Sequence, residues 1–222
     1  MKTAGVYPIL LAVVLLVSCG GRESIPELSQ QERQAIVLEN QRYRIERMEF
    51  FRDAASSPFQ IDTSVTFHEL SWFDVDPAFR GVSPLHRYPD PEVVEICATG
   101  GEIREQIRYG YFAFPIPDTA GNAVIIRLNV YKYPPGSQYY HPFRNTLSIW
   151  FTDETTGLET YGVGRYVDAG DEHPDPGHLY TIDLNQSYNP FCAYSTLYSC
   201  AIPSEADHIP HPIPVGERNY AH

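Results

Sequence analysis

The sequence predicts a mainly β domain with one N-terminal helix, an α+β fold whose antiparallel strands form a meander closed as a barrel or a sandwich. Three observations support this prediction: a helical period over residues 29–53, short alternating segments from residue 66 onward, and turn-forming glycines and prolines between those segments. Short strands joined by turns pair most readily with their neighbours in the chain, and such pairing gives antiparallel sheets.

The first residues have the features of a bacterial lipoprotein signal. Lys2 gives a short positive start, and the apolar run over residues 6–17 is too short for a typical membrane span. The run ends in Leu16-Val17-Ser18-Cys19, which resembles the lipobox, where a cysteine is acylated and becomes the mature N-terminus. The alternative is a secretory signal that happens to contain a cysteine, but the run length and the residues before Cys19 favour the lipobox.

This signal divides the chain into three parts. We expect residues 1–18 to be a removed signal peptide, residues 19–28 a tether, and residues 29–222 a single β-rich domain. Acyl chains such as palmitate on Cys19 would anchor the protein to a membrane of the bacterial cell envelope, at the outer membrane or the periplasmic face in a Gram-negative host. Several chains hold a protein better than one, since each buried methylene contributes about 0.8 kcal/mol.

The mature chain is acidic. The precursor has a net charge of −12, and the removed segment carries one lysine and no acid, so the remaining 222 − 18 = 204 residues carry −12 − 1 = −13. This charge argues against binding to nucleic acid and against electrostatic attraction to anionic lipid. The sequence identifies no protein partner, and it contains no motif for a cofactor or a metal ion.

An amphipathic helix is expected at the start of the domain. Ser29 and Glu32 match the S-x-x-E capping box, and Ile36, Tyr43 and Phe50 recur at every seventh residue. The helix should have about six turns and should plug an end of the β structure or cover one of its faces.

The rest of the chain has the pattern of short strands. Residues 74–91 carry four prolines and are expected to be irregular, and the proline-rich end over residues 208–214 is expected to be an edge or polyproline-like segment. The expected strands are residues 67–73, 92–98, 103–114, 123–132, 146–152, 161–167 and 180–185.

Three cysteines remain when Cys19 is acylated. Cys192 and Cys200 are the closest in sequence, and we expect them to form a disulfide because the cell envelope is oxidising. Cys97 lies in an apolar pattern and is expected to be an inert thiol in the core.

Charged, hydroxyl and glycine residues are densest between residues 150 and 168. Residues of the same parity share one face of a strand, so Glu159, Tyr161 and Arg165 would project together, with room left by two intervening glycines. An arginine offers a planar fork for a carboxylate or phosphate, which predicts a site for a small polar or anionic ligand. The alternative is an internal Arg–Glu pair across a hairpin.

A second polar stretch follows. In this stretch Tyr188, Asn189 and Cys192 are expected to form one wall of the same site. Catalysis is the alternative function: a hydrolase with Glu159 as general acid or base, or with Cys192 as nucleophile, although a disulfide would remove that thiol. The histidine-bearing segments 171–178 and 205–211 lack recognised metal-ligand spacing and are expected to be solvated loops.

Several of these stretches also carry a resemblance. The runs T-D-E-T-T-G-L-E-T-Y-G-V-G-R-Y, Y-N-P-F-C-A-Y and P-V-G-E resemble the bacterial family known as domain of unknown function 1684, and Arg108-Tyr109-Gly110 fits it as well. The resemblance covers about residues 40–218 and implies a single domain, often on a lipoprotein, with no known activity. A structural or partner-binding lipoprotein, with the motifs devoted to folding, is therefore a third functional hypothesis.

Overall fold

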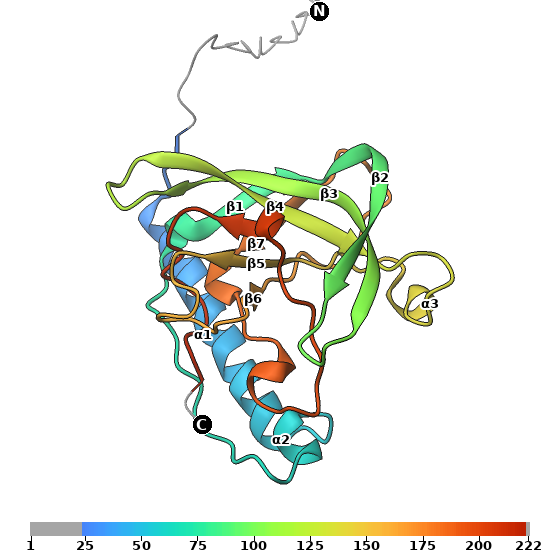
Figure 1. Ribbon diagram of the computed structural model, residues 1–222. Coiled ribbons are helices and arrows are strands. Elements are labelled where there is room, and N and C mark those ends of the chain that lie inside the picture. Colours follow the sequence, from blue (N-terminus) through green and yellow to red (C-terminus); the bar gives the residue numbers. More distant parts are fainter. Residues whose placement is uncertain (1–23, 221–222) are drawn as a thin grey trace, which may run out of the picture.

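The computed structural model describes residues 24–220, so the expected signal peptide and Cys19 lie outside the described residues. The fold is mainly β with one long N-terminal helix, as predicted (Figure 1). The helices are α1 (Gln30–Asp53), α2 (Pro58–Ile61) and α3 (Tyr140–Phe143), with 3-10 turns η1 (Pro77–Phe79), η2 (Leu184–Gln186), η3 (Phe191–Ala193) and η4 (Glu205–Asp207). The strands are β1 (Arg80–Pro84), β2 (His86–Cys97), β3 (Ile103–Pro117), β4 (Ala123–Lys132), β5 (Trp150–Asp153), β6 (Arg165–Tyr166), β7 (Leu179–Asp183) and β8 (His208–Ile209).

The strands form three small sheets. The largest has the order β2-β3-β4 and is a meander of antiparallel neighbours, as the alternation between residues 92 and 132 predicted. A second sheet pairs β1 with β7, and a third has the order β6-β5-β8, in which β8 runs parallel to β5. Within residues 24–220 no sheet closes on itself into a barrel.

The main core lies between the β2-β3-β4 sheet and the segment that leads into β5. Phe112, Phe114 and Ile116 alternate along β3 with exposed or half-buried residues, so one face of the strand is apolar. From the other side Leu147, Ile149 and Phe151 are all buried, which confirms that these three residues share a face.

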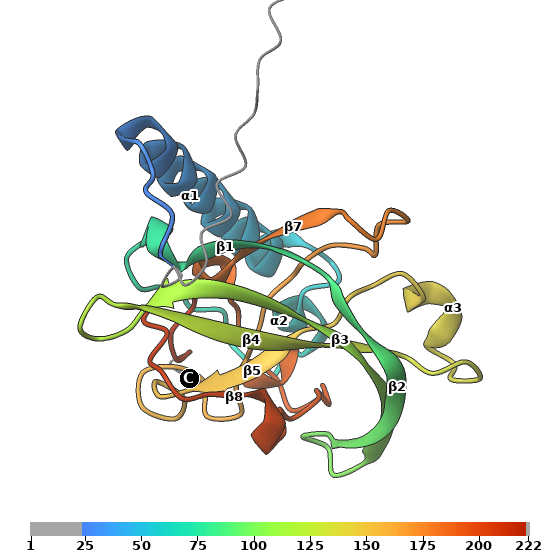
Figure 2. The same cartoon turned by 90° about the horizontal axis from the view of Figure 1, so that it is seen from above.

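Helix α1 lies beside the β1–β7 pair rather than over the large sheet (Figure 2). Its predicted capping box is confirmed, because Ser29 accepts the Glu32 backbone N–H and the Glu32 carboxylate accepts the Ser29 N–H. The buried Asn40 amide donates to the Asp183 carboxylate at 2.8 Å, which fixes the helix to the end of β7. No helix within the described residues has both the length and the apolar character needed to cross a membrane.

Four predictions about local structure were wrong. Residues 67–73 are extended but form only one isolated bridge, at Trp72, and residues 74–91 contain β1 and the start of β2. The expected strand over residues 161–167 is reduced to the two residues of β6. The thiol of Cys97 is exposed, because the alternation of β2 directs its neighbour Ile96 into the interior instead.

The two motif glycines Gly110 and Gly162 differ in the space available for a side chain. A Cβ atom on Gly110 would lie 2.5 Å from the backbone oxygen of His86 on the adjacent strand, which leaves no space for it. A Cβ atom on Gly162 would meet nothing closer than 3.8 Å.

We therefore expect Gly110→Ala to lower the free energy of unfolding by about 1–3 kcal/mol, because it overpacks the β2–β3 interface. Gly162→Ala is the matched control and should leave stability unchanged or raise it by about 0.4–1 kcal/mol, since it restricts the unfolded chain. Urea denaturation of both variants measures the difference. Equal effects from the two substitutions would contradict this account of Gly110.

Candidate functional site

The three residues expected to share a strand face do not lie together. Arg165 is fully buried, Tyr161 is half-buried, and Glu159 is exposed. Turns occupy the chain between β5 and β6, so the alternation assumed for residues 159–165 is not present. Gly164 has a φ of +115°, and a Cβ there would lie 2.7 Å from the carbonyl oxygen of Phe151. This glycine allows the chain to turn tightly into β6.

Arg165 forms an internal ion pair with Asp153 rather than with Glu159. Its Nη2 atom lies 2.9 Å from the Asp153 Oδ2 atom, and both side chains are inaccessible to solvent. Burial lowers the pKa of Arg165, and Asp153 acts in the opposite direction. An arginine remains protonated under these conditions, so its charge is compensated inside the protein.

The same guanidinium also binds the C-terminal segment. Nη2 donates to the carbonyl of Ile213 at 2.9 Å, and Nη1 donates to the carbonyl of Val215. Asp153 accepts the backbone N–H groups of Thr155 at 2.7 Å and Ile213 at 3.2 Å. This ion pair therefore joins β5, β6 and residues 213–217. Both Nη atoms of Arg165 are bonded within the protein, so neither is free to bind a ligand.

Glu217, the acid of the P-V-G-E motif, lies at the centre of a second buried network. Its carboxylate accepts the side-chain amide of Asn189 at 3.0 Å and the hydroxyl of Tyr194. Arg47 of α1 lies 3.5 Å from it. Burial raises the pKa of Glu217, and these partners act in the opposite direction. Asn189 is therefore part of the protein's internal framework.

Glu159 and Tyr161 make peripheral contacts. Glu159 forms an exposed ion pair with Arg218, with 3.2 Å between the Oε1 and Nη2 atoms. The hydroxyl of Tyr161 donates to the carbonyl of Cys192 at 3.3 Å. Exposed ion pairs of this kind contribute little to stability.

We expect Arg165→Met to lower the free energy of unfolding by about 3–5 kcal/mol, because it leaves the carboxylate of Asp153 buried without its cation. Arg218→Met removes the exposed partner of Glu159 and should cost no more than about 1 kcal/mol. Thermal and urea unfolding of the two variants provides the measurement. A loss of similar size in both would contradict a structural role for the buried pair.

The residue after Arg165 faces a cavity. Tyr166 points to the opposite side of β6, where the structure encloses about 260 Å³. The main lining side chains come from β3, β5, β6 and the segments after β4, β6, η2 and η3. They are Arg104, Gln106, Tyr133, Trp150, Tyr166, Asp168, Tyr188 and Cys200. Of the expected wall residues only Tyr188 lines this cavity.

Aromatic rings form much of the cavity wall. Trp150 stacks on the buried Tyr131 at 4.4 Å between ring centroids, and Tyr166 follows at 5.8 Å from Trp150. Tyr188 lies 6.1 Å from Tyr166, and the two residues exchange backbone hydrogen bonds of 2.9 Å. This bridge joins the G-R-Y motif to the Y-N-P motif, so the ladder of rings has a fixed geometry.

Two buried polar atoms of the lining residues have no hydrogen-bond partner within residues 24–220. They are Oε1 of Gln106 and Nε1 of Trp150. Both side chains are almost fully buried, at 3% and 4% exposure. Leaving such an atom unpaired costs about 1–3 kcal/mol. Both atoms are inaccessible to solvent, and the side chain of Gln106 is also hydrogen-bonded to Tyr133.

The charged side chains of the cavity form hydrogen bonds within the protein. Arg104 donates from Nε to the Glu102 carboxylate at 3.0 Å and from Nη2 to the carbonyl of Ser199 at 3.0 Å. At the other end the hydroxyl of Tyr188 donates to Asp168 at 2.9 Å. Burial, followed by the charge of Asp168, raises the pKa of Tyr188, so this hydroxyl remains protonated at neutral pH.

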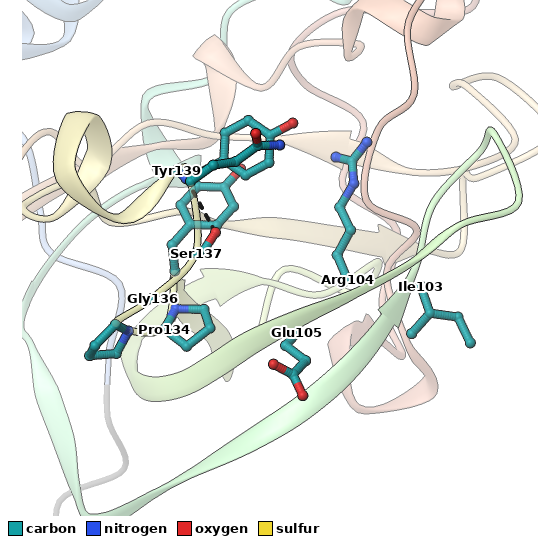
Figure 3. Close-up of a pocket in the computed structure, with 10 residues that line it drawn as sticks. Ile103, Arg104, Glu105, Pro134, Gly136, Ser137 and Tyr139 are labelled. Atoms are coloured by element: carbon teal, nitrogen blue, oxygen red, sulfur yellow. Dashed lines mark hydrogen bonds between the residues drawn. The ribbon is translucent and has the colours of Figure 1, made fainter.

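A second chamber of about 390 Å³ adjoins the first. It is lined by the start of β3 and by the loop of residues 133–139, and it shares Arg104 and Tyr133 with the first chamber. In Figure 3 the side chains of Arg104 and Glu105 project in opposite directions from β3, and both residues belong to the lining of this chamber. The two chambers therefore meet at Arg104 and Tyr133.

Cys192 and Cys200 are close neighbours, and both are free thiols in this structure. The backbone N–H of Cys192 lies 3.3 Å from the sulfur of Cys200. A hydrogen bond from the Cys200 thiol is the largest of the effects that lower the pKa of Cys192 to about 7. Cys200 lines the first chamber, whereas Cys192 does not.

The two acidic, histidine-bearing segments are held to the sheet by their carboxylates. Glu172 binds Arg87 at 2.7 Å and Lys132 at 2.6 Å, and Asp207 accepts the hydroxyl of Tyr131 at 2.7 Å. In the part of the chain that the structure describes, no three His, Cys, Asp or Glu residues are grouped to hold a metal ion.

The sequence prediction missed Arg104, Gln106, Trp150 and Tyr166. The available signal was parity: Arg104 and Gln106 share the face of β3 opposite Glu105, and Tyr166 is one residue from the predicted Arg165. Nothing local indicated which face of β6 adjoins a cavity, because that depends on segments distant in sequence.

The structure is that of a small β-rich domain with a lateral cavity lined by aromatic residues. The chain belongs to the family described as protein of unknown function DUF1684, whose model matches residues 65–218, which confirms the resemblance seen in the motifs. It is similar to an uncharacterized protein of Haloarcula marismortui from gene locus rrnAC0354, solved by solution NMR. The two are 28% identical over 86% of this chain and 97% of that chain, with a TM-score of 0.57. No curated protein matches the chain.

Proposed function

We propose that this protein is a lipid-anchored receptor domain of the bacterial cell envelope that binds a small polar ligand in the cavity beside β5 and β6. The observation that carries the proposal is the lining of that cavity, where Trp150, Tyr166 and Tyr188 lie together with the amide-bearing Gln106. Binding sites in proteins commonly combine apolar walls with a few polar groups that orient the ligand. The lipid anchor rests on the lipobox-like sequence that ends at Cys19.

The proposed site is displaced from the strand face that the sequence suggested. Arg165 and Asn189 are bound internally, and they hold in place the neighbours that line the cavity, Tyr166 and Tyr188. We take the three open sheets to pack as a sandwich whose lateral edge forms the cavity. The motifs then have two roles, because they support the core and position the aromatic wall.

Catalysis by Glu159 or Cys192 receives less support. Glu159 is exposed and paired with Arg218, and these surroundings provide no enclosed site for a substrate. The hydrolase alternative would have to use Cys192 as the thiolate, with a base that no contact of this residue supplies. The extensive internal bonding of Arg165 and Glu217 favours a structural role for the motifs as the second candidate.

We expect Cys192 and Cys200 to be joined in the exported protein, since the thiols are adjacent and the envelope is oxidising. Labelling of the denatured, unreduced mature protein with a maleimide should then detect one thiol, that of Cys97. Cys97→Ser is the matched control and should reduce the count to zero. Three reactive thiols in the parent protein would contradict the disulfide and would keep Cys192 available as a nucleophile.

The binding proposal is tested with Gln106→Leu, which replaces an unpaired buried acceptor by an apolar group of similar size. We expect stability to change by no more than about 1 kcal/mol, because the substitution removes an uncompensated polar atom and a hydrogen bond to Tyr133 together. Binding should be lost at the same time. The chain has two tryptophans, so a Trp72→Phe background leaves Trp150 as the only indole that reports on the cavity.

The fluorescence of Trp150 would be titrated with glucose, galacturonic acid, glutamate and a nucleoside monophosphate, one probe from each of four small polar classes. A saturable change with at least one probe, abolished by Gln106→Leu in a fully folded protein, supports the proposal. A flat response to all four, or a response that survives Gln106→Leu, overturns it. Arg218→Met is distant from the cavity lining and should bind like the parent.

A further inference from the structure

The two chambers have the dimensions and chemistry of one elongated site. They share Arg104 and Tyr133, so a ligand seated against Trp150 extends past these residues toward the loop of residues 133–139. Together the separate volumes of about 260 Å³ and 390 Å³ exceed what one small polar molecule fills. The ligand of this site is therefore longer than a single ring.

Aromatic side chains occur along the whole length of the site. Trp150, Tyr166 and Tyr188 line the first chamber, Tyr133 lies at the junction, and Tyr139 lines the second (Figure 3). Aromatic rings present flat apolar surfaces, and tyrosine and tryptophan add a polar group at the edge. Flat rings with polar edges match a chain of sugar rings, which have apolar C–H faces and hydroxyl groups around their rims.

The polar groups of the site are mostly amides and hydroxyls. They belong to Gln106, Ser137, Gln138, Thr146 and Ser148, which are distributed over the two chambers. Amide and hydroxyl groups match sugar hydroxyls, because each hydroxyl both donates and accepts hydrogen bonds.

The charged side chains of the site disfavour an anionic ligand. Arg104, the cation of the lining, is bound to Glu102, and the carboxylates of Asp168 and Glu105 also belong to the lining. An anionic ligand would have to displace Glu102 from Arg104 in the presence of these carboxylates. This arrangement favours a ligand without negative charge.

From the shared junction, the aromatic walls and the internal charge pairs, we infer that the double chamber binds a neutral oligosaccharide of two or more pyranose rings. The inference rests on the proposed binding function and specifies the class of its ligand. One ring lies against Trp150 in the first chamber, and the chain of rings continues past Tyr133 to Tyr139.

The inference is tested by calorimetric titration of the full mature protein with cellotriose, chitotriose and maltotriose, and with glucose, N-acetylglucosamine and trigalacturonate for comparison. At least one neutral trisaccharide should bind about tenfold more tightly than its monosaccharide, because it occupies both chambers. Trigalacturonate should bind more weakly than that trisaccharide. If no trisaccharide binds more tightly than its monosaccharide, or if trigalacturonate binds most tightly, the inference is overturned.

The second chamber is tested with Tyr139→Ala, which should remove most of the gain of the trisaccharide and leave monosaccharide binding unchanged. Tyr140→Ala is the matched control, since this neighbouring tyrosine lines neither chamber and should have no effect. Equal affinities of the parent and Tyr139→Ala for the trisaccharide would overturn the inference.

Failure of this inference differs from failure of the binding proposal. A small polar probe that saturates the Trp150 signal and depends on Gln106, combined with no gain from trisaccharides, leaves the cavity as a binding site and rejects the oligosaccharide. Absence of any response at Trp150, for monosaccharides and trisaccharides alike, rejects both.

Discussion

The buried ion pair of Arg165 and Asp153 is the interaction on which the arrangement of the C-terminal third of the chain depends. A charge this deep in a protein is tolerated only when other groups compensate it, and here the compensation comes from Asp153 and from the carbonyls of Ile213 and Val215. Meeting this requirement fixes the path of residues 213–217. That path in turn places Glu217 where it binds Asn189, Tyr194 and Arg47.

The two buried networks, centred on Arg165 and Glu217, hold in place the segments that line the cavity. Because side chains alternate along β6, fixing Arg165 on the interior side directs Tyr166 to the other side, against Trp150. The backbone bridge between Tyr166 and Tyr188 carries the same constraint to the next motif. The motifs that identify the family therefore shape the cavity indirectly, since their buried charges hold the adjacent residues that line it.

The sequence predicted what local patterns determine. Helix α1 with its capping box, the β3–β4 hairpin and the shared face of Leu147, Ile149 and Phe151 follow from periodicity alone. The strand over residues 161–167 failed because Gly164 turns the chain sharply before β6. Prolines are typical of loops. Those of β2 nevertheless lie in an edge strand, at the point where the register shifts between Arg87 and Glu92. The partner of Arg165 and the cavity depend on non-local packing, which a local pattern does not encode.

The significance of a buried polar atom without a hydrogen-bond partner depends on its surroundings. Arg165 Nε and Asn189 Oδ1 also lack partners within the described residues, but they belong to side chains whose other polar atoms are bonded inside the core. Gln106 and Trp150 instead line a cavity walled by aromatic rings. The side chain of Gln106 is hydrogen-bonded to Tyr133, a residue shared by the two chambers. An apolar residue at position 106 would remove the unpaired acceptor and this contact together, so the amide contributes to the shape of the cavity wall as well as to its polarity.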